Sequence, residues 1–96
     1  MIGFNLSGWV VQSWDPRPLA HEVENLRATK DGMVLLARSM QRASGPTFVQ
    51  ATLTRVKPPL SRGVVAKVLA SVLPRARWVR RRGSELWVAI LPEVKP

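Results

Sequence analysis

The chain has 96 residues, no cysteine, one histidine and a formal net charge of +9 at pH 7. The lack of cysteine excludes disulfides, thiol catalysis and thiolate metal sites, and a lone His21 cannot build a histidine metal cage. We therefore expect no cofactor. The apolar runs are shorter than the roughly 20 residues of a membrane span, and the first residues lack the pattern of a signal peptide. The expected location is a cytoplasm, its own or that of a host cell, with no membrane contact.

The positive charge is concentrated in the second half of the chain. Residues 1–48 contain five Lys or Arg and four acids, whereas residues 49–96 contain ten Lys or Arg and two acids. Dense positive charge on a small domain favours a bound polyanion, and nucleic acid is the commonest polyanion in a cell. Surface charge that only maintains solubility is the simpler alternative.

The first predicted elements are a strand and a helix. Apolar residues alternate over residues 2–14, which predicts a strand. Asp15 and Pro16 are typical of a helix start, because Asp accepts free N–H groups and Pro fits the first helical position. Apolar residues follow at helical spacing from Leu19, and the turn ending at Gly32 is expected to end the helix.

Two strands are expected next. Residues 33–41 could form a strand or a helix, and turn signals on both sides favour the strand. Residues 47–56 alternate in polarity and predict its antiparallel partner.

A second helix is predicted over residues 61–73. Ser61 is the expected cap, Leu60 would pack on Val65 as a hydrophobic staple, and Pro74 would end the helix.

The most informative segment is a predicted β-hairpin over residues 76–91, with a two-residue turn at Gly83-Ser84. This register places Arg80 opposite Trp87 and Trp78 opposite Ala89. One face of the hairpin is then expected to enter the core, and it carries Val79, Leu86, Val88 and Ile90. The other face would carry Trp78, Arg80, Arg82 and Trp87.

The element order predicts an α+β fold: one small domain over residues 1–91 with a ferredoxin-like β-α-β-β-α-β order, its last strand doubled as a basic C-terminal hairpin, and a tail over residues 92–96. A winged-helix-like domain, with residues 17–42 mostly helical, is the alternative. The order is similar to that of the RNA-recognition motif, and Gly45, Phe48 and Val49 agree with its third-strand signature. Other signature positions differ, so the similarity is one of architecture and identifies no family.

The predicted fold leaves one sheet face open. The polar parity of the strands would place on it Trp9, Phe48, Gln50, Thr52, Trp78, Arg80 and Trp87. Such a surface could stack bases and bind phosphates. Two simpler readings stay open: the tryptophans belong to the core, and the arginines keep an edge strand from pairing with other chains.

These patterns predict a non-enzymatic protein that binds nucleic acid, single-stranded RNA or DNA favoured. The candidate binding residues are Phe48, Arg55, Lys57, Arg62, Lys67, Arg75, Arg77, Trp78, Arg80, Arg81, Arg82 and Trp87. The alternative is a small accessory or virus-encoded regulator that binds another protein through the same Trp and Arg face, or forms a homodimer. A ribonuclease site around His21, with Glu22, Glu24 and Arg17, is a weaker hypothesis because adjacent helical side chains diverge.

Overall fold

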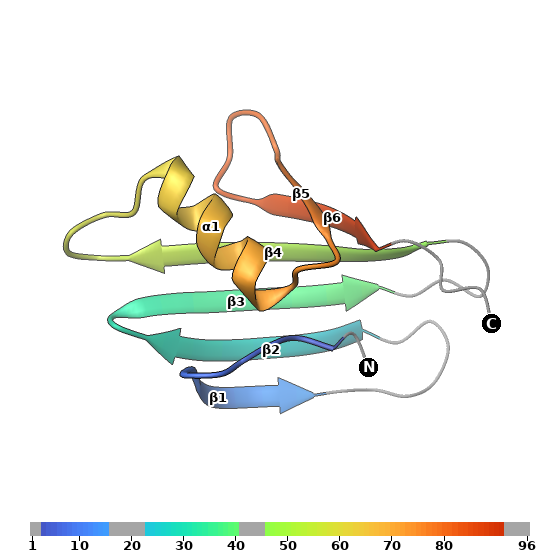
Figure 1. Cartoon of the computed structure of the whole chain (residues 1–96), viewed down its shortest axis with the longest axis horizontal. Helices are drawn as coiled ribbons and strands as arrows, with labels where there is room; N and C mark the ends of the chain where they lie inside the picture. The colour runs from blue at the N-terminus through green and yellow to red at the C-terminus, as the bar shows by residue number, and fades with distance from the viewer. Residues whose placement is uncertain (1–2, 16–22, 41–45, 92–96) are drawn as a thin grey trace.

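The protein, known here from a computed structural model, consists of one antiparallel sheet covered on one face by a short helix (Figure 1). The structure describes residues 3–15, 23–40 and 46–91. The strands within these ranges are β1 Val10–Asp15, β2 Val23–Lys30, β3 Met33–Met40, β4 Thr47–Arg55, β5 Arg77–Arg80 and β6 Trp87–Leu91, and the helix is α1 Arg62–Val72.

The strand order in the sheet is β1-β2-β3-β4-β6-β5. The first four strands form a meander, in which each strand pairs with the next one along the chain. The chain then forms α1 and returns as the β5–β6 hairpin, with β6 pairing with β4. The two edges of the sheet are therefore β1 and the arginine-rich β5.

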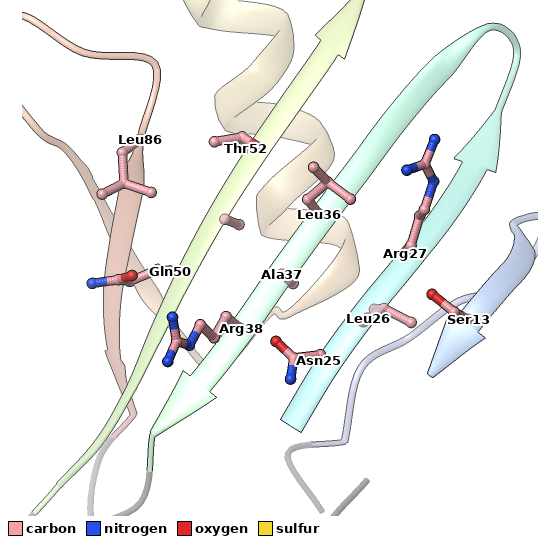
Figure 2. Close-up of a pocket in the computed structure, with 11 residues that line it drawn as sticks. Ser13, Asn25, Leu26, Arg27, Leu36, Ala37, Arg38, Gln50, Thr52 and Leu86 are labelled. Carbon is pink, nitrogen blue, oxygen red and sulfur yellow. The ribbon is translucent and has the colours of Figure 1, made fainter. Parts of the chain in front are cut away.

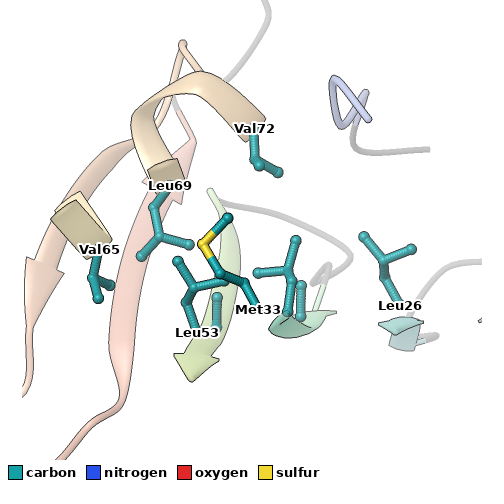
Figure 3. Close-up of a cluster of buried hydrophobic side chains, with 9 residues drawn as sticks. Leu26, Met33, Leu53, Val65, Leu69 and Val72 are labelled. Carbon is teal, nitrogen blue, oxygen red and sulfur yellow. The ribbon is translucent and has the colours of Figure 1, made fainter. Parts of the chain in front are cut away.

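The core lies between the sheet and α1 (Figure 3). On the helix, Val65, Leu69 and Val72 are buried at i, i+4 and i+7 spacing, as an amphipathic helix requires. The sheet contributes alternate residues of its central strands, namely Leu26, Met33, Leu35, Ala37, Ala51 and Leu53.

The N-terminal segment before β1 packs on the same side of the sheet as α1 (Figure 1). Phe4, Leu6 and Trp9 pack against the core cluster. The Asn5 backbone N–H also donates a hydrogen bond of 2.7 Å to the Val72 carbonyl oxygen, at the end of α1. Helix and segment together cover this face.

The ferredoxin-like prediction is wrong, because its first helix is absent over residues 23–30, which form β2. Residues 16–22, where that helix was expected to begin, lie outside the described residues. Glu24, Leu26 and Ala28 are buried while Asn25 and Arg27 are exposed, and this period of two is that of a strand.

The turn between β2 and β3 explains why a strand forms there. Asp31 has φ 51° and Gly32 has φ 76°, and Lys30 pairs with Met33 across them. Two consecutive residues with positive φ form the tight hairpin turn that matches the twist of flanking strands. Because β2 and β3 are both strands, the winged-helix alternative is also wrong.

The first predicted strand is shorter than expected. It begins at Val10 rather than at residue 2, and Asp15 is its last residue; the residues that Asp15 was expected to cap lie outside the described ranges.

Several other predictions are confirmed. The strands predicted over residues 33–41 and 47–56 are present as an antiparallel pair. The second helix begins after Ser61, whose Oγ accepts a hydrogen bond of 3.3 Å from the Val64 N–H, and it ends just before Pro74. The predicted tail over residues 92–96 lies outside the described residues.

The predicted hairpin register is confirmed, but its loop is longer. Arg80 faces Trp87 and Trp78 faces Ala89. The Arg81 N–H donates to the Leu86 carbonyl at 2.9 Å, and the Ser84 N–H donates to the Arg81 carbonyl at 3.2 Å. The turn is therefore centred on residues 82 and 83, within a four-residue loop, and the two-residue loop at Gly83-Ser84 is wrong. Lengthening the loop by one residue on each side leaves the register unchanged.

Candidate nucleic-acid interface

The sheet face opposite α1 carries a second set of side chains, which we call the open face (Figure 2). In a sheet, residues opposite each other in register project to the same side. The register joins Asn25 to Arg38 and Arg38 to Gln50, while their chain neighbours Leu26, Ala37 and Ala51 are buried under the helix. The open face includes Ser13, Asp15, Asn25, Arg27, Leu36, Arg38, Phe48, Gln50, Thr52, Arg77, Val79, Arg81, Leu86, Val88 and Ile90.

One half of the open face is polar and spans β1 to β4. We call it the polar half, and it comprises Ser13, Asn25, Arg27, Arg38, Gln50 and Thr52. These residues, with Leu36 and Leu86, line a shallow depression of about 360 Å³ (Figure 2). The Arg27 Nε donates a hydrogen bond of 2.8 Å to the Gln12 Oε1, which holds that guanidinium toward the edge strand β1.

The other half is apolar and lies over β6 and β5. We call it the apolar half, and it comprises Val79, Val88 and Ile90 with Arg77 and Arg81. Val79 is 62% exposed and Ile90 is 50% exposed. The five residues line a groove of about 450 Å³. Arg77 and Arg81 lie two residues before and after Val79, so that both ends of the apolar strip are cationic.

The carboxylates that the structure describes lie mostly away from these arginines. Glu24 is buried on the helix side, where its Oε1 accepts a hydrogen bond of 2.7 Å from the Trp14 Nε1. Asp31 lies in the β2–β3 turn and Glu85 in the β5–β6 loop. Only Asp15, at the end of edge strand β1 and opposite Asn25, shares the open face among described carboxylates. The open face therefore carries four arginines with one described acid at its margin.

The tryptophans expected on the open face lie on the helix side instead. Trp9, Trp78 and Trp87 are half-buried and pack against the core. The Trp78 Nε1 donates a hydrogen bond of 3.1 Å to the Leu69 carbonyl oxygen in α1. The prediction that these three rings form an exposed platform is wrong.

The pairing of β6 with β4 explains the reversal. Ala89 lies opposite Val49, and Trp87 lies opposite Ala51. Val49 and Ala51 face the helix, as the alternation of β4 predicted, so Trp87 and Ala89 must face it too. Both faces of β6 are apolar, and its own alternation therefore does not reveal which face is buried. Phe48, Gln50 and Thr52 lie on the open face as expected; Gln50 is exposed, whereas Phe48 and Thr52 are half-buried.

The predicted cationic residues divide between two sides of the sheet. Arg77 and Arg81 lie on the open face. Arg80 points to the helix side, where it lines a small cavity of about 210 Å³ with Arg62, Glu85 and Trp87. The two sets do not form one surface.

The remaining predicted cations lie on connections or on α1. Arg55 donates from its Nε to the Pro58 carbonyl oxygen at 2.7 Å, and Lys57 is exposed in the bend that follows β4. Lys67 is exposed on α1, whose opposite side packs on the sheet. Arg75 and Arg82 are exposed before β5 and in the hairpin loop.

The sequence interpretation missed Arg27, Arg38 and Asn25, which lie in the polar half. The local signal for them was the short polar–apolar alternation of residues 25–29, but the spacing of Leu19, Val23 and Leu26 favoured a helix. A helix would have dispersed these side chains around its surface.

Of the residues in the ribonuclease hypothesis, the structure describes only Glu24, which is buried on the helix side of the sheet. His21, Glu22 and Arg17 of the ribonuclease hypothesis lie outside the described residues. Within the described ranges, no three His, Asp or Glu side chains are grouped so that they could hold a metal ion. No helix in the described part of the chain has the length and apolar character needed to cross a membrane.

Over residues 3–15, 23–40 and 46–91, the fold is a six-stranded antiparallel sheet with one helix on one side. Comparison with protein-family models, with curated proteins and with solved structures finds no match to this chain.

Proposed function

We propose that this protein is a non-enzymatic nucleic-acid-binding protein that holds single-stranded RNA or DNA on its open face. The observation that supports this function best is the charge of that face: Arg27, Arg38, Arg77 and Arg81 share it, with Asp15 alone among described carboxylates at its edge. Arginine forms forked hydrogen bonds with phosphate, and its charge is permanent.

The shape of the face favours a single strand over a duplex. Six strands about 4.8 Å apart give a sheet about 24 Å wide. The major groove of B-form DNA is about 12 Å wide, so the sheet cannot enter it. A single strand can instead lie across the sheet with its unstacked bases against the surface. The apolar half then offers a contact for base faces between two phosphate-binding arginines.

A charge-matched pair of variants tests this function. R38Q/R77Q removes two positive charges from the open face, and R62Q/K67Q removes two from the helix side. Charged hydrogen bonds contribute about 1.5–3 kcal/mol each, so the loss of two in R38Q/R77Q should weaken binding about 100-fold or more. R62Q/K67Q should weaken it much less, through the general field alone.

The measurement is fluorescence anisotropy with labelled single-stranded RNA, single-stranded DNA and duplex DNA of equal length. Equal losses in both double variants would mean that net charge, and not the open face, controls binding. No binding to any oligonucleotide at low salt would exclude the proposed function.

A second candidate function rests on the apolar half. Val79 and Ile90 are exposed large hydrophobic residues on adjacent strands, and contiguous exposed apolar surface marks interaction sites. A protein partner, or a second copy of this chain, would be expected to bind with little dependence on salt. V79T/I90T should abolish such an interface, whereas it should weaken single-strand binding only modestly. Sedimentation of the wild type at several concentrations tests self-association.

A further inference from the structure

On the open face, Arg38 lies in a different environment from Arg77 and Arg81. Arg77 and Arg81 lie among aliphatic side chains, with Val79 between them on β5. Arg38 lies in the middle of a cross-strand row, between Asn25 on β2 and Gln50 on β4 (Figure 2). Neighbouring strands are about 4.8 Å apart, so the three side chains of this row are within reach of one small planar ligand.

The difference in surroundings matters because phosphates and bases are bound by different hydrogen-bonding groups. A phosphate accepts hydrogen bonds and carries charge, so a cation is sufficient to bind it. The edge of a base both donates and accepts, and amide side chains do the same. An arginine with an amide on each side therefore suits a base edge better than a phosphate.

Among the bases, guanine fits this row best. A guanidinium only donates, and guanine presents two adjacent acceptors, O6 and N7, which an arginine fork binds together. Adenine places an amino group beside N7, and that group would oppose the guanidinium. The guanine N1–H, next to O6, can donate a hydrogen bond to an amide oxygen of Asn25 or Gln50. The depression of about 360 Å³ in front of these residues gives the base a place on the sheet.

We propose that Arg38, supported by Asn25 and Gln50, recognises a guanine of the bound single strand, while Arg77 and Arg81 bind its phosphates. This inference rests on the proposed function and adds a base preference to it. The strands β3 and β5 are three strand spacings apart in the sheet, about 14 Å, so base recognition and phosphate binding occur at different nucleotides.

The test uses short uridine oligonucleotides with a single central G, A, C or 7-deazaguanine, and the matching thymidine DNA series. Wild-type protein should bind the G oligonucleotide about 5- to 100-fold more tightly than the uniform one, which is the usual discrimination by a bidentate pair. The 7-deazaguanine oligonucleotide lacks N7 and should lose most of this advantage. The RNA and DNA series together show which sugar the face accepts.

Two lysine variants separate base recognition from charge. R38K keeps the charge but loses the fork, so it should reduce the G preference to less than about threefold while binding the uniform oligonucleotide nearly as well as wild type. R77K should retain the G preference. Arg38 and Arg77 are both exposed, and unchanged melting temperatures would verify that both variants fold.

Three results would overturn the guanine assignment but not the proposed function: equal wild-type affinity for all central bases, a preference for C or A, or a G preference that survives R38K. Absence of binding to every oligonucleotide would overturn the proposed function as well.

Discussion

Trp78 connects the basic hairpin to the helix through both its ring and its indole N–H. The ring packs against the core, and Nε1 donates to the Leu69 carbonyl oxygen at 3.1 Å. That oxygen also accepts a hydrogen bond of 3.0 Å from the Leu73 N–H, so it keeps a partner if the indole is lost. The residue therefore acts in stability, and its hydrogen bond is a minor part of its effect.

This placement predicts a graded series of stability losses. Trp78→Phe keeps a ring and should cost about 1 kcal/mol, the usual contribution of one hydrogen bond. Trp78→Ala removes the ring and should cost roughly 3 kcal/mol or more. Urea denaturation measures both values. Single-strand affinity at low temperature, where Trp78→Ala remains folded, should stay within about twofold of wild type. A large affinity loss in a fully stable Trp78→Phe would instead place the ring in the binding site.

At the scale of single elements, the start of α1 depends on one side chain. Ser61 caps the helix by accepting from the Val64 N–H, and the first turn contains no acidic residue. Ser61→Ala should destabilise the protein by about 1 kcal/mol, the typical effect of losing an N-cap. Ser61→Asp keeps the cap and adds a negative charge near the positive end of the helix, so it should be neutral or stabilising. Thermal melting of the two variants measures this difference, and equal losses would show that the cap is not important.

The β2–β3 turn gives a second prediction, in which the same substitution has opposite effects at two glycines. Gly32 has φ 76°, and a Cβ there would meet nothing closer than the Arg55 side chain at 3.7 Å. Gly32→Ala should therefore cost about 1–2 kcal/mol through backbone strain alone. Gly63 lies in the first turn of α1 with open space around it, so Gly63→Ala should stabilise by about 0.5 kcal/mol. Equal signs in denaturation experiments would contradict the assigned turn.

The elements show what the sequence could predict and what it could not. Local signals identified α1 and the β5–β6 register, because the Ser61 cap, Pro74 and the turn around Gly83 act within a few residues. The face of β6 could not be predicted from the hairpin, since both of its sides are apolar. It follows from pairing with β4, which lies more than thirty residues earlier in the chain. The same reasoning explains why Arg38 was not recognised as central to the open face: its importance depends on strands β2 and β4 lying on either side of it.

At the scale of the whole molecule, charge should make salt act in opposite directions on folding and binding. The free protein carries +9, and screening its self-repulsion should raise its melting temperature. Binding should weaken with salt instead. If Arg27, Arg77 and Arg81 each contact one phosphate while Arg38 contacts a base, the logarithm of affinity should fall with the logarithm of salt concentration at a slope near −2 for single strands.

Anisotropy titrations between about 0.05 and 0.3 M salt measure this slope, and melting curves in the same buffers measure the effect on the free protein. R38Q/R77Q should reduce the magnitude of the slope by roughly 0.7, because only Arg77 of the pair contacts a phosphate. A flat binding curve in wild type would exclude phosphate contacts as the main source of affinity.

The strand order also has a kinetic consequence. Strands β1 to β4 pair with chain neighbours, but β6 pairs with β4 across the whole segment that contains α1 and β5. Closing a long loop costs more entropy than forming a tight turn, so we expect the β2–β3 turn to form early and the β4–β6 pairing late. Gly32→Ala should then mainly slow folding, whereas Ala89→Gly in β6 should mainly accelerate unfolding, as stopped-flow chevron plots would report. The arginines of the β5–β6 hairpin would join those of β2 and β3 only in the last step of folding. A chain without this pairing would therefore present only the polar half of the open face.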